Sequence, residues 1–306
     1  MNILFIGLGS IGQRHLRNIK SIYPNFKFFA YRVKNRNFEI KDNKKYLKKN
    51  FIKNFNITII KKLNKESLEK IDVGFICNPT SEHIKFSTIL AKHKIHLFIE
   101  KPVSNNLKGL KKLDQIIKKN KIFCLVGYNL RFHIIYRKIK EMINKNFFGK
   151  IYFAEFYNGE YLPDYHSYEN YKKTYMAQKK LGGGVLLTQI HELDMIIDFF
   201  GIPKKISSIL TKISDLKIDV EDLVKSIMVS KKNTVIHLHL DYIKRPPERY
   251  VKIYGSENSI FWNYYKNSLE YFNKKEILNK KLKIKFDRNK MFKEELKYFF
   301  KNLNQK

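Results

Sequence analysis

Residues 2–12 read Asn-Ile-Leu-Phe-Ile-Gly-Leu-Gly-Ser-Ile-Gly, an apolar run that leads directly into three spaced glycines. The run over 2–6 predicts a short buried strand, and apolar residues at helical spacing over 11–22 predict a helix after it. Glycines at this spacing between a strand and a helix are typical of a turn that holds the pyrophosphate of a dinucleotide. The alternative is a glycine turn that binds no ligand.

Each residue of the glycine segment has a predicted role in holding phosphates. Gly7 permits the tight turn, Gly9 lets the backbone approach the phosphates, and Gly12 allows the helix to pack closely on the strand. Ser10 and Ile11 open the helix, whose N-terminal N–H groups attract an anion. We therefore predict that these five residues bind the cofactor.

Short apolar runs alternate with helical patterns as far as residue 127, where the pattern changes. Predicted strands cover 2–6, 27–31, 57–60, 73–77, 95–99 and 122–126, and predicted helices cover 11–22, 66–70, 80–93 and 107–119. Strands this short and apolar need cover on both faces, which favours a doubly wound parallel sheet. Residues 1–127 therefore form the predicted cofactor-binding domain of an α/β protein.

Residues 128–306 predict a second domain of the α+β class with a predominantly antiparallel sheet. A helix is expected over 134–143 and another after the glycines at 182–184, and an amphipathic helix over 291–303. Predicted strands cover 151–157, 206–213, 224–229, 234–242, 250–254 and 259–262, with turn signals between them. The lysine-rich segment 274–285 is expected to be an exposed strand or hairpin.

The composition of the 306 residues indicates a folded protein of the reducing cytoplasm. Apolar residues make up 43%, yet no run approaches the roughly 20 residues of a membrane span, and no basic-then-apolar leader opens the chain. Cys77 and Cys124 lie far apart in the sequence. His237 and His239 alternate on one predicted strand without a third ligand. We therefore expect no disulfide framework, no metal site and no membrane contact.

The net charge of +33 has two readings. Sixty-one Lys and Arg against 28 Asp and Glu would suit a protein that binds nucleic acid. However, 52 of the 61 are lysines spread along the chain, and Ile, Asn, Phe and Tyr also abound. This pattern favours compositional drift and solvated faces over a functional basic surface. We expect a small-molecule substrate and no nucleic-acid partner.

The end of the second strand decides between the two nicotinamide dinucleotides. Enzymes that use NAD usually carry an acidic residue there for the ribose hydroxyls. This chain has Ala30-Tyr31-Arg32 instead. The planar guanidinium of Arg32 suits a 2′-phosphate, which slightly favours NADP over NAD. The alternative is an ordinary surface arginine in a basic protein.

Four further motifs stand at the ends of predicted strands or open a helix. Cys77-Asn78-Pro79-Thr80 is followed by His83, and Glu100-Lys101-Pro102 ends the next strand. Gly127-Tyr128-Asn129-Leu130-Arg131 ends the last strand of the first domain. The glycines at 182–184 precede Thr188-Gln189-Ile190-His191-Glu192-Leu193-Asp194. In this order the motifs resemble the glucose–fructose oxidoreductase/inositol dehydrogenase/MocA (Gfo/Idh/MocA) family over nearly the whole chain.

The resemblance implies both an activity and an assembly. Members of the family are NAD(P)-dependent oxidoreductases that act mostly on secondary alcohols of sugars, sugar nucleotides or cyclic polyols. They pair a Rossmann domain with an α+β domain whose open sheet commonly forms the subunit interface. The resemblance therefore implies a homo-oligomer that assembles through the C-terminal sheet.

The resemblance also implies roles for particular residues. Lys101 would stand beside the nicotinamide and the reacting hydroxyl, His191 would be the acid/base, and Glu100 would approach the nicotinamide ribose. The cofactor group further contains Asn78, Pro79, Thr80, His83 and Asn129. His83 is expected to brace the start of its helix. Arg131 and Asp194 would help to shape the substrate pocket.

The residue types at positions 101 and 191 fit the oxidation of an alcohol. The hydride passes to C4 of the nicotinamide, and the hydroxyl proton needs a base. A histidine titrates near neutral pH and suits this role at position 191. Lys101 can donate to the developing alkoxide and relay the proton. The two roles could also be exchanged.

The segment from Gly159 to Tyr175 is rich in tyrosine and predicts sugar contacts. Aromatic faces and polar groups suit a sugar, so Tyr161, Asp164 and His166 are candidate substrate residues. The segment also resembles that of family members found with surface-glycan pathways. An ordinary tyrosine-rich loop is the alternative.

One position departs from the family pattern. Members commonly have an aspartate three or four residues before the catalytic histidine, where this chain has Thr188 and Leu187. Thr188 can hydrogen-bond but cannot carry the charge, and we assign it to the group of substrate residues. The departure leaves a second reading open, a cofactor-binding sensor or scaffold without turnover, and a nucleic-acid binder remains a third.

Overall fold

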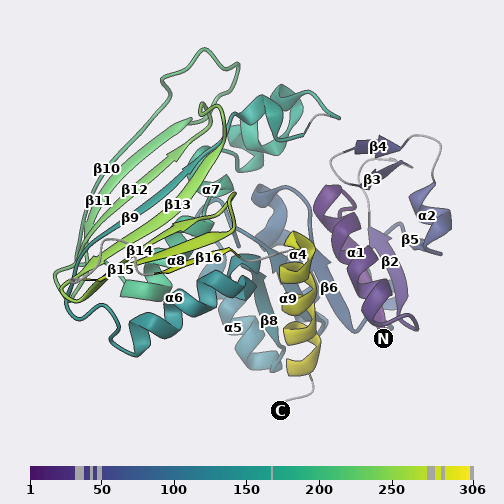
Figure 1. The fold of residues 1–306 in the computed structure, drawn as a ribbon. Coiled ribbons are helices and arrows are strands. Elements are labelled where there is room, and N and C mark those ends of the chain that lie inside the picture. The colour runs from purple at the N-terminus through teal and green to yellow at the C-terminus, as the bar shows by residue number, and fades with distance from the viewer. Residues whose placement is uncertain are drawn as a thin grey trace.

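The computed structural model describes residues 1–31, 38–41, 44–46, 50–166, 168–273, 280–283 and 287–303. It contains two large sheets, each covered by helices, and the chain crosses from the first to the second after residue 127 (Figure 1). Helices that are long and apolar enough to cross a membrane are absent from these described ranges. The predicted fold class, a doubly wound parallel sheet followed by an α+β unit, is confirmed.

The first sheet has six parallel strands in the order β5-β2-β1-β6-β7-β8. The strands are β1 (Asn2–Ile6), β2 (Lys27–Tyr31), β5 (Thr58–Ile60), β6 (Val73–Ile76), β7 (His96–Glu100) and β8 (Cys124–Gly127). The helices are α1 (Ser10–Ile22), α2 (Phe51–Asn54), α3 (Lys65–Leu68), α4 (His83–Lys92) and α5 (Leu110–Asn120). Because all strands run the same way, their carboxyl ends meet at one edge, where the glycine turn and the later motifs gather.

Helix α9 (Arg288–Asn302) returns from the second unit to cover the first sheet. In Figure 1 this helix lies against the parallel sheet beside α1. Its Leu296, Phe299 and Phe300 share one apolar cluster with Phe75 and Phe98 of the parallel strands. The division at residue 127 stays a prediction, and the packing shows that part of the later sequence completes the core of the earlier unit.

The second sheet has eight strands in the order β10-β11-β12-β9-β13-β14-β15-β16. Every neighbouring pair is antiparallel except β12 and β9. The strands are β9 (Ile151–Gly159), β10 (Lys205–Thr211), β11 (Leu223–Val229), β12 (Val235–Asp241), β13 (Glu248–Gly255), β14 (Asn258–Asn263), β15 (Ser268–Asn273) and β16 (Lys280–Lys283). Helices α6 (Ile134–Asn144), α7 (Val185–Thr188) and α8 (His191–Phe200) cover one face and leave the other open (Figure 1).

Some local elements differ from the prediction. A hairpin of β3 (Glu39–Lys41) and β4 (Lys44–Tyr46) and the strand β15 were not expected. In β15, Leu269 and Tyr271 pack into the core, but Phe272 breaks the alternation with polar residues, so the strand does not stand out beside the lysine-rich segment. The helix expected after the glycines is two helices, α7 and α8, which are separated at Gln189 and Ile190.

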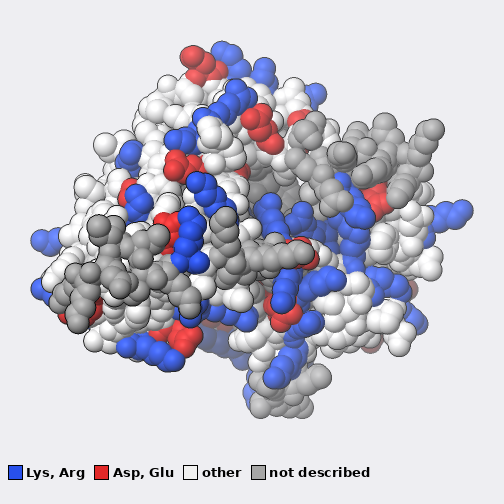
Figure 2. Space-filling view, viewed as in Figure 1, with Lys and Arg blue, Asp and Glu red and all other residues white. Residues whose placement is uncertain are grey.

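The face of the molecule that Figure 2 shows carries both basic and acidic side chains. On the face shown in Figure 2, Lys and Arg are scattered over many elements, and Asp and Glu lie among them. Such a mixture fits solvated faces better than a continuous track for a nucleic-acid backbone.

Candidate active site

The glycine turn has the geometry of a phosphate-binding loop. Gly7 has a φ of +94°, and a Cβ there would lie 3.0 Å from the backbone of Asn78. A Cβ at Gly12 would lie 2.6 Å from the Gly7 carbonyl oxygen, so that position also requires glycine. A Cβ at Gly9 would meet no atom within 4 Å. The turn is therefore close-packed beneath Gly7 and Gly12 and open above Gly9, where Ser10 begins α1.

The turn after β6 supplies a second wall of this opening. The Asn78 side chain has a buried amide oxygen and nitrogen that make no hydrogen bond in the described structure. Pro79 precedes a short 3₁₀ turn that begins at the buried Thr80. The buried ring of His83 lies between two backbone oxygens, with Nδ1 2.9 Å from Pro102 O and Nε2 2.9 Å from Asn78 O. His83 thus braces the turn, as expected, and burial lowers its pKa.

Lys101 follows the last residue of β7 and reaches the second unit. Its ammonium Nζ donates a hydrogen bond to the Thr188 carbonyl oxygen at 2.6 Å. Burial lowers the pKa of Lys101, although the Glu100 charge opposes this. The Glu100 carboxylate itself lies 2.6 Å from Nε2 of His15, a contact that the sequence did not suggest.

His191 is the first residue of α8 and lies in the same neighbourhood. Its ring makes an edge contact with Tyr128, with ring centres 5.9 Å apart. Burial and the nearby charge of Lys101 lower the pKa of His191 well below 6.5, so its imidazole is neutral at pH 7. In the described structure its Nδ1 is buried and makes no hydrogen bond, so no carboxylate orients the ring.

The residue after His191, Glu192, forms a buried ion pair with Arg249. Glu192 is fully buried, and its Oε1 lies 2.6 Å from both Nε and Nη2 of Arg249. Asn158 donates to the other carboxylate oxygen at 3.3 Å. Burial still raises the pKa of Glu192, while the arginine opposes this. Sequence reasoning missed the pair, although Arg249 stands in phase with the inward-facing Val251 and Ile253 of β13.

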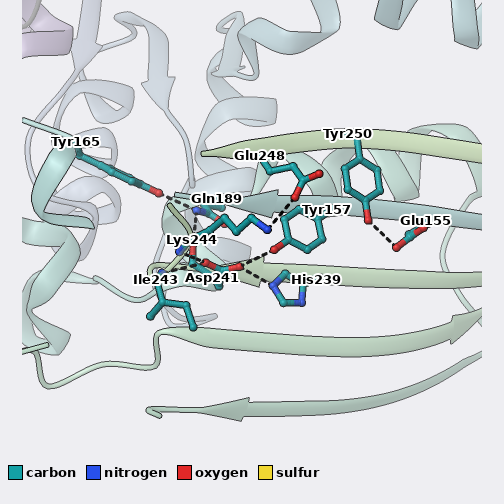
Figure 3. Close-up of polar contacts among 10 residues, drawn as sticks. All are labelled: Glu155, Tyr157, Tyr165, Gln189, His239, Asp241, Ile243, Lys244, Glu248 and Tyr250. Carbon is teal, nitrogen blue, oxygen red and sulfur yellow. Dashed lines mark hydrogen bonds and ion pairs between the residues drawn. The ribbon is translucent and has the colours of Figure 1, made fainter. Parts of the chain in front are cut away.

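A polar network that includes His239 and Asp241 of β12 reaches Gln189, the residue after Thr188 (Figure 3). Gln189 donates to the Tyr165 hydroxyl at 2.7 Å and to the Asp241 carbonyl at 3.0 Å. The Asp241 carboxylate in turn binds His239 at 2.6 Å. The next residue, Tyr242, places its hydroxyl 2.6 Å from the Thr188 hydroxyl. The Thr188 side chain is therefore 7% exposed and engaged with the protein.

His239 and His237 lie on the open face of β12, as their alternation suggests. His239 is 8% exposed because its ring stacks on Tyr157, with ring centres 4.3 Å apart. Three or more His, Cys, Asp or Glu side chains do not converge on a metal-binding position anywhere in the described ranges.

Two predicted substrate residues bind one another. Arg131 donates to both carboxylate oxygens of Asp194, at 2.8 and 2.7 Å, and so joins the turn after β8 to helix α8. Its guanidinium also lies 5.9 Å from the centre of the Tyr128 ring. Asn129 is half-buried in the same turn. The pair lies one helical turn beyond His191, at the junction of the two units.

The three candidates of the tyrosine-rich segment have local partners. Asp164 pairs with Arg245 at 3.2 Å, and that guanidinium lies 3.4 Å above the Tyr161 ring. His166 lies 3.0 Å from Glu169. Both side chains of the Asp164 pair are more than half exposed. Their role in substrate binding stays a prediction.

The predicted cofactor-selecting residue, Arg32, lies outside the described residues.

The glycines at 182–184 have a packing role. A Cβ at Gly182, whose φ is +80°, would lie 2.9 Å from the Cβ atoms of Asn105 and Thr80. This glycine therefore lets the loop of the second unit touch the turn after β6.

Comparison with known proteins identifies both units. Residues 1–128 match a family described as an oxidoreductase family with an NAD-binding Rossmann fold. Residues 136–261 match a GFO/IDH/MocA C-terminal domain. Myo-inositol 2-dehydrogenase of Thermotoga maritima is 27% identical over 201 residues, which cover 64% of this chain and 53% of that protein. The chain thus spans about half the length of the curated relatives it matches.

Two solved structures have the same fold over the whole chain. Levoglucosan dehydrogenase, solved in complex with NADH, has a TM-score of 0.82 at 18% identity, with 100% of this chain and 90% of that chain covered. UDP-N-acetylglucosamine 3-dehydrogenase from Acidithiobacillus ferrooxidans has a TM-score of 0.77 at 16% identity, with 100% and 89% covered. At these identities the likeness establishes the fold.

Proposed function

The chain belongs to the Gfo/Idh/MocA family of oxidoreductases, and from this premise we propose that it transfers a hydride between a nicotinamide cofactor and a secondary alcohol. The substrate class we propose is a sugar, a sugar nucleotide or a cyclic polyol, and the metabolic setting we propose is that of surface glycans. The proposal rests on one observation: Lys101 at the end of β7 donates to the carbonyl of Thr188, three residues before His191. A proton-accepting and a proton-donating side chain thus come from two units to one place.

Features of the first unit fit a dinucleotide. Above Gly9 the backbone is open, and the N–H groups of α1 begin at Ser10. The Asn78 amide is buried and has no hydrogen-bond partner among the described residues, as expected of a group that meets a ligand. Gly7, Gly9, Ser10, Ile11, Gly12 and Asn78 would hold the cofactor. When bound, the nicotinamide accepts or supplies the hydride.

His191 is suited to accept the hydroxyl proton in the oxidising direction. A general base must be unprotonated, and the lowered pKa of His191 keeps its imidazole neutral at pH 7. Within the described part of the chain, its buried Nδ1 makes no hydrogen bond. We propose that this ring takes the proton as the alcohol becomes a carbonyl.

Lys101 is suited to stabilise the oxygen that loses this proton. Its ammonium is held at the Thr188 carbonyl and can turn a second N–H toward a substrate oxygen. Because burial lowers the pKa of Lys101, it can also exchange a proton more readily than a solvated lysine. We therefore propose Lys101 as the electrostatic and proton-relay partner of His191.

The finer assignments are proposals as well. We propose a slight preference for NADP because Arg32 replaces the usual acid after β2. We propose Arg131, Asp194, Tyr161, Asp164, His166 and Thr188 as residues that line or shape the substrate pocket. Arg131 and Asp194 would act as a joined pair, since each oxygen of the carboxylate already accepts from the guanidinium.

A homo-oligomer through the open sheet face is the proposed assembly. On that face Ile209 and Ile227 are 63% and 56% exposed, although the opposite face of the same sheet is packed under helices. A second copy that covers these residues would remove apolar surface from water. Light scattering of Ile227→Glu should show a smaller particle than the natural protein. Ile202→Glu, at an apolar residue outside the strands, should leave the particle size unchanged.

The test of the activity begins with binding. We expect purified protein to bind NADPH or NADH in a fluorescence titration, with NADPH tighter if Arg32 meets a 2′-phosphate. A screen of sugar nucleotides and polyols should then give turnover that falls at least about a hundredfold, the lower range for loss of an acid/base group, in Lys101→Met and in His191→Asn. Absence of cofactor binding would contradict the proposal.

A second candidate is a cofactor-binding sensor or scaffold without turnover. The observation in its favour is that, among the residues that the structure describes, no carboxylate binds the buried Nδ1 of His191. It predicts tight cofactor binding, together with no hydride transfer in the screen and no effect of Lys101→Met on any rate.

A further inference from the structure

Helix α1 carries a buried histidine, His15, whose ring reaches Glu100, the residue before Lys101. His15 is fully buried, and its Nε2 lies 2.6 Å from Oε1 of Glu100. Glu100 is also buried, with 9% of its surface exposed. The other oxygen of Glu100 accepts the backbone N–H of Lys101 at 3.2 Å. One carboxylate therefore joins the phosphate-loop helix to the main chain of Lys101.

The surroundings leave this carboxylate little freedom. Gly127 lies opposite Glu100 on β8, and a Cβ there would be 3.4 Å from Glu100 Oε1. On the far side of Lys101, the ring of His83 holds the Pro102 carbonyl at 2.9 Å. The segment from 100 to 102 is thus held by His15 at Glu100 and by His83 at Pro102, so a change at Glu100 acts on Lys101.

We propose that His15 is a positioning residue for Lys101 and acts through the Glu100 carboxylate. The inference rests on the proposed function, because it gives a role to a side chain that does not touch the reacting groups. His15 holds Glu100 in its place, and Glu100 sets both the backbone and the charge environment of Lys101. The electrostatic side is direct, since the Glu100 charge raises the pKa of Lys101 against the effect of burial.

Other titratable groups also interact with Glu100 and Lys101. The Glu100 charge acts on Cys77, His83, Tyr175 and Glu295, of which Glu295 is a buried acid whose pKa is raised by burial. Lys101 also senses Glu192, Arg249 and Arg288, and it lowers the pKa of His191. None of these replaces His15 as the hydrogen-bond partner of Glu100 Oε1.

Replacement of His15 by Leu should change how Lys101 titrates. Without His15, the Glu100 carboxylate would lose the hydrogen bond at Oε1 that holds it in place, so it would support the lysine ammonium less well. We would measure the rate of Lys101 acetylation by acetic anhydride against pH, by peptide mass spectrometry of the full-length protein. The midpoint in His15→Leu should fall by about one pH unit. His15→Gln retains an N–H donor and should recover much of the shift.

A mutant cycle separates this effect from loss of structure. Glu100→Gln should itself lower the Lys101 midpoint, and His15→Leu should add nothing in that background. His133→Asn is the matched control, since His133 is also fully buried but caps α6 in the other unit. It should leave the Lys101 midpoint unchanged. An unchanged midpoint in His15→Leu, or an equal shift with and without Glu100, would overturn the inference.

The labelling does not depend on turnover and therefore separates the two proposals. If the natural protein oxidises no substrate while the cycle behaves as described, the proposed function fails and the link from His15 to Lys101 stands. If turnover is found, His15→Leu should lower kcat more than it raises KM and should move the alkaline limb of the rate to lower pH. His15→Gln should restore both.

Discussion

The ammonium of Lys101 donates to the backbone carbonyl of Thr188 at 2.6 Å, so a peptide group of one unit holds the lysine of the other. The Thr188 hydroxyl is engaged elsewhere, 2.6 Å from the hydroxyl of Tyr242. Tyr242 also reaches the Gly184 carbonyl at 2.9 Å. The side chain at 188 thus fixes the loop, while its main chain fixes the lysine.

This division of roles predicts a mild phenotype for Thr188→Val. The valine keeps the shape and the carbonyl, and Tyr242 keeps Gly184 as a partner, so kcat should stay within about threefold. The free energy of unfolding should fall by about 1 kcal/mol for the lost hydrogen bond. Steady-state kinetics and urea denaturation measure the two quantities. A hundredfold loss of kcat with normal stability would show that the hydroxyl takes part in the chemistry.

The glycine turn predicts two different outcomes for two alanine substitutions. Gly12→Ala places a methyl group 2.6 Å from the Gly7 oxygen and should cost about 1–3 kcal/mol of stability as well as cofactor affinity. Gly9→Ala meets no protein atom within 4 Å and should leave stability nearly unchanged. Its methyl group should nevertheless weaken cofactor binding about tenfold or more, that is by about 1.4 kcal/mol. Thermal unfolding and a nucleotide titration check both; full affinity in Gly9→Ala would argue against a pyrophosphate there.

The buried pair of Glu192 and Arg249 predicts strong coupling. Arg249→Met would leave a buried carboxylate without its cation and should lower the free energy of unfolding by about 3–5 kcal/mol. The double variant Glu192→Leu with Arg249→Met should recover most of this loss. The control is the exposed pair of Asp114 and Lys118, whose nitrogen and oxygen are also only 2.7 Å apart, where Asp114→Ala should change little. Equal losses in the single and double variants would argue against the pairing.

His133 predicts a pH-dependent stability. Burial lowers its pKa from 6.5 to about 4, and its Nδ1 accepts the Ile135 N–H that begins α6. Because the folded pKa lies below the unfolded one, this contribution is complete above pH 6.5 and is lost as the pH falls toward 4.

The comparison with His133→Asn isolates that contribution from other acid-sensitive groups. Between pH 7.5 and 4.5, the natural protein should lose about 2 kcal/mol more than the variant in urea denaturation. Parallel pH profiles for the two proteins would mean that His133 titrates normally.

The sequence was most informative where a pattern was local. The apolar run before Gly7 and the alternation that follows it predicted the parallel sheet, because each strand in it is short, apolar and bounded by a turn. The motifs at Asn78 and Lys101 could be placed at one edge, since parallel strands end on the same side.

The pairings across the fold could not be read from the sequence. Arg131 and Asp194 were both selected as pocket residues, but only the packing of α8 against the turn after β8 shows that they bind each other. Glu192 received no role from the sequence, although it follows His191 directly. Its partner Arg249 comes from a strand far along the chain, and no local pattern links the two.

The position of α9 has a consequence for how the protein folds while it is being synthesised. Phe299 lies against Phe75 and Phe98, with ring centres 5.8 and 5.5 Å apart, so the last helix closes a sheet whose strands are translated first. While the intervening residues are being translated, α9 is not yet present to cover that apolar surface. The first unit therefore cannot complete this part of its core until α9 has been translated, which makes the docking of α9 a late step of folding.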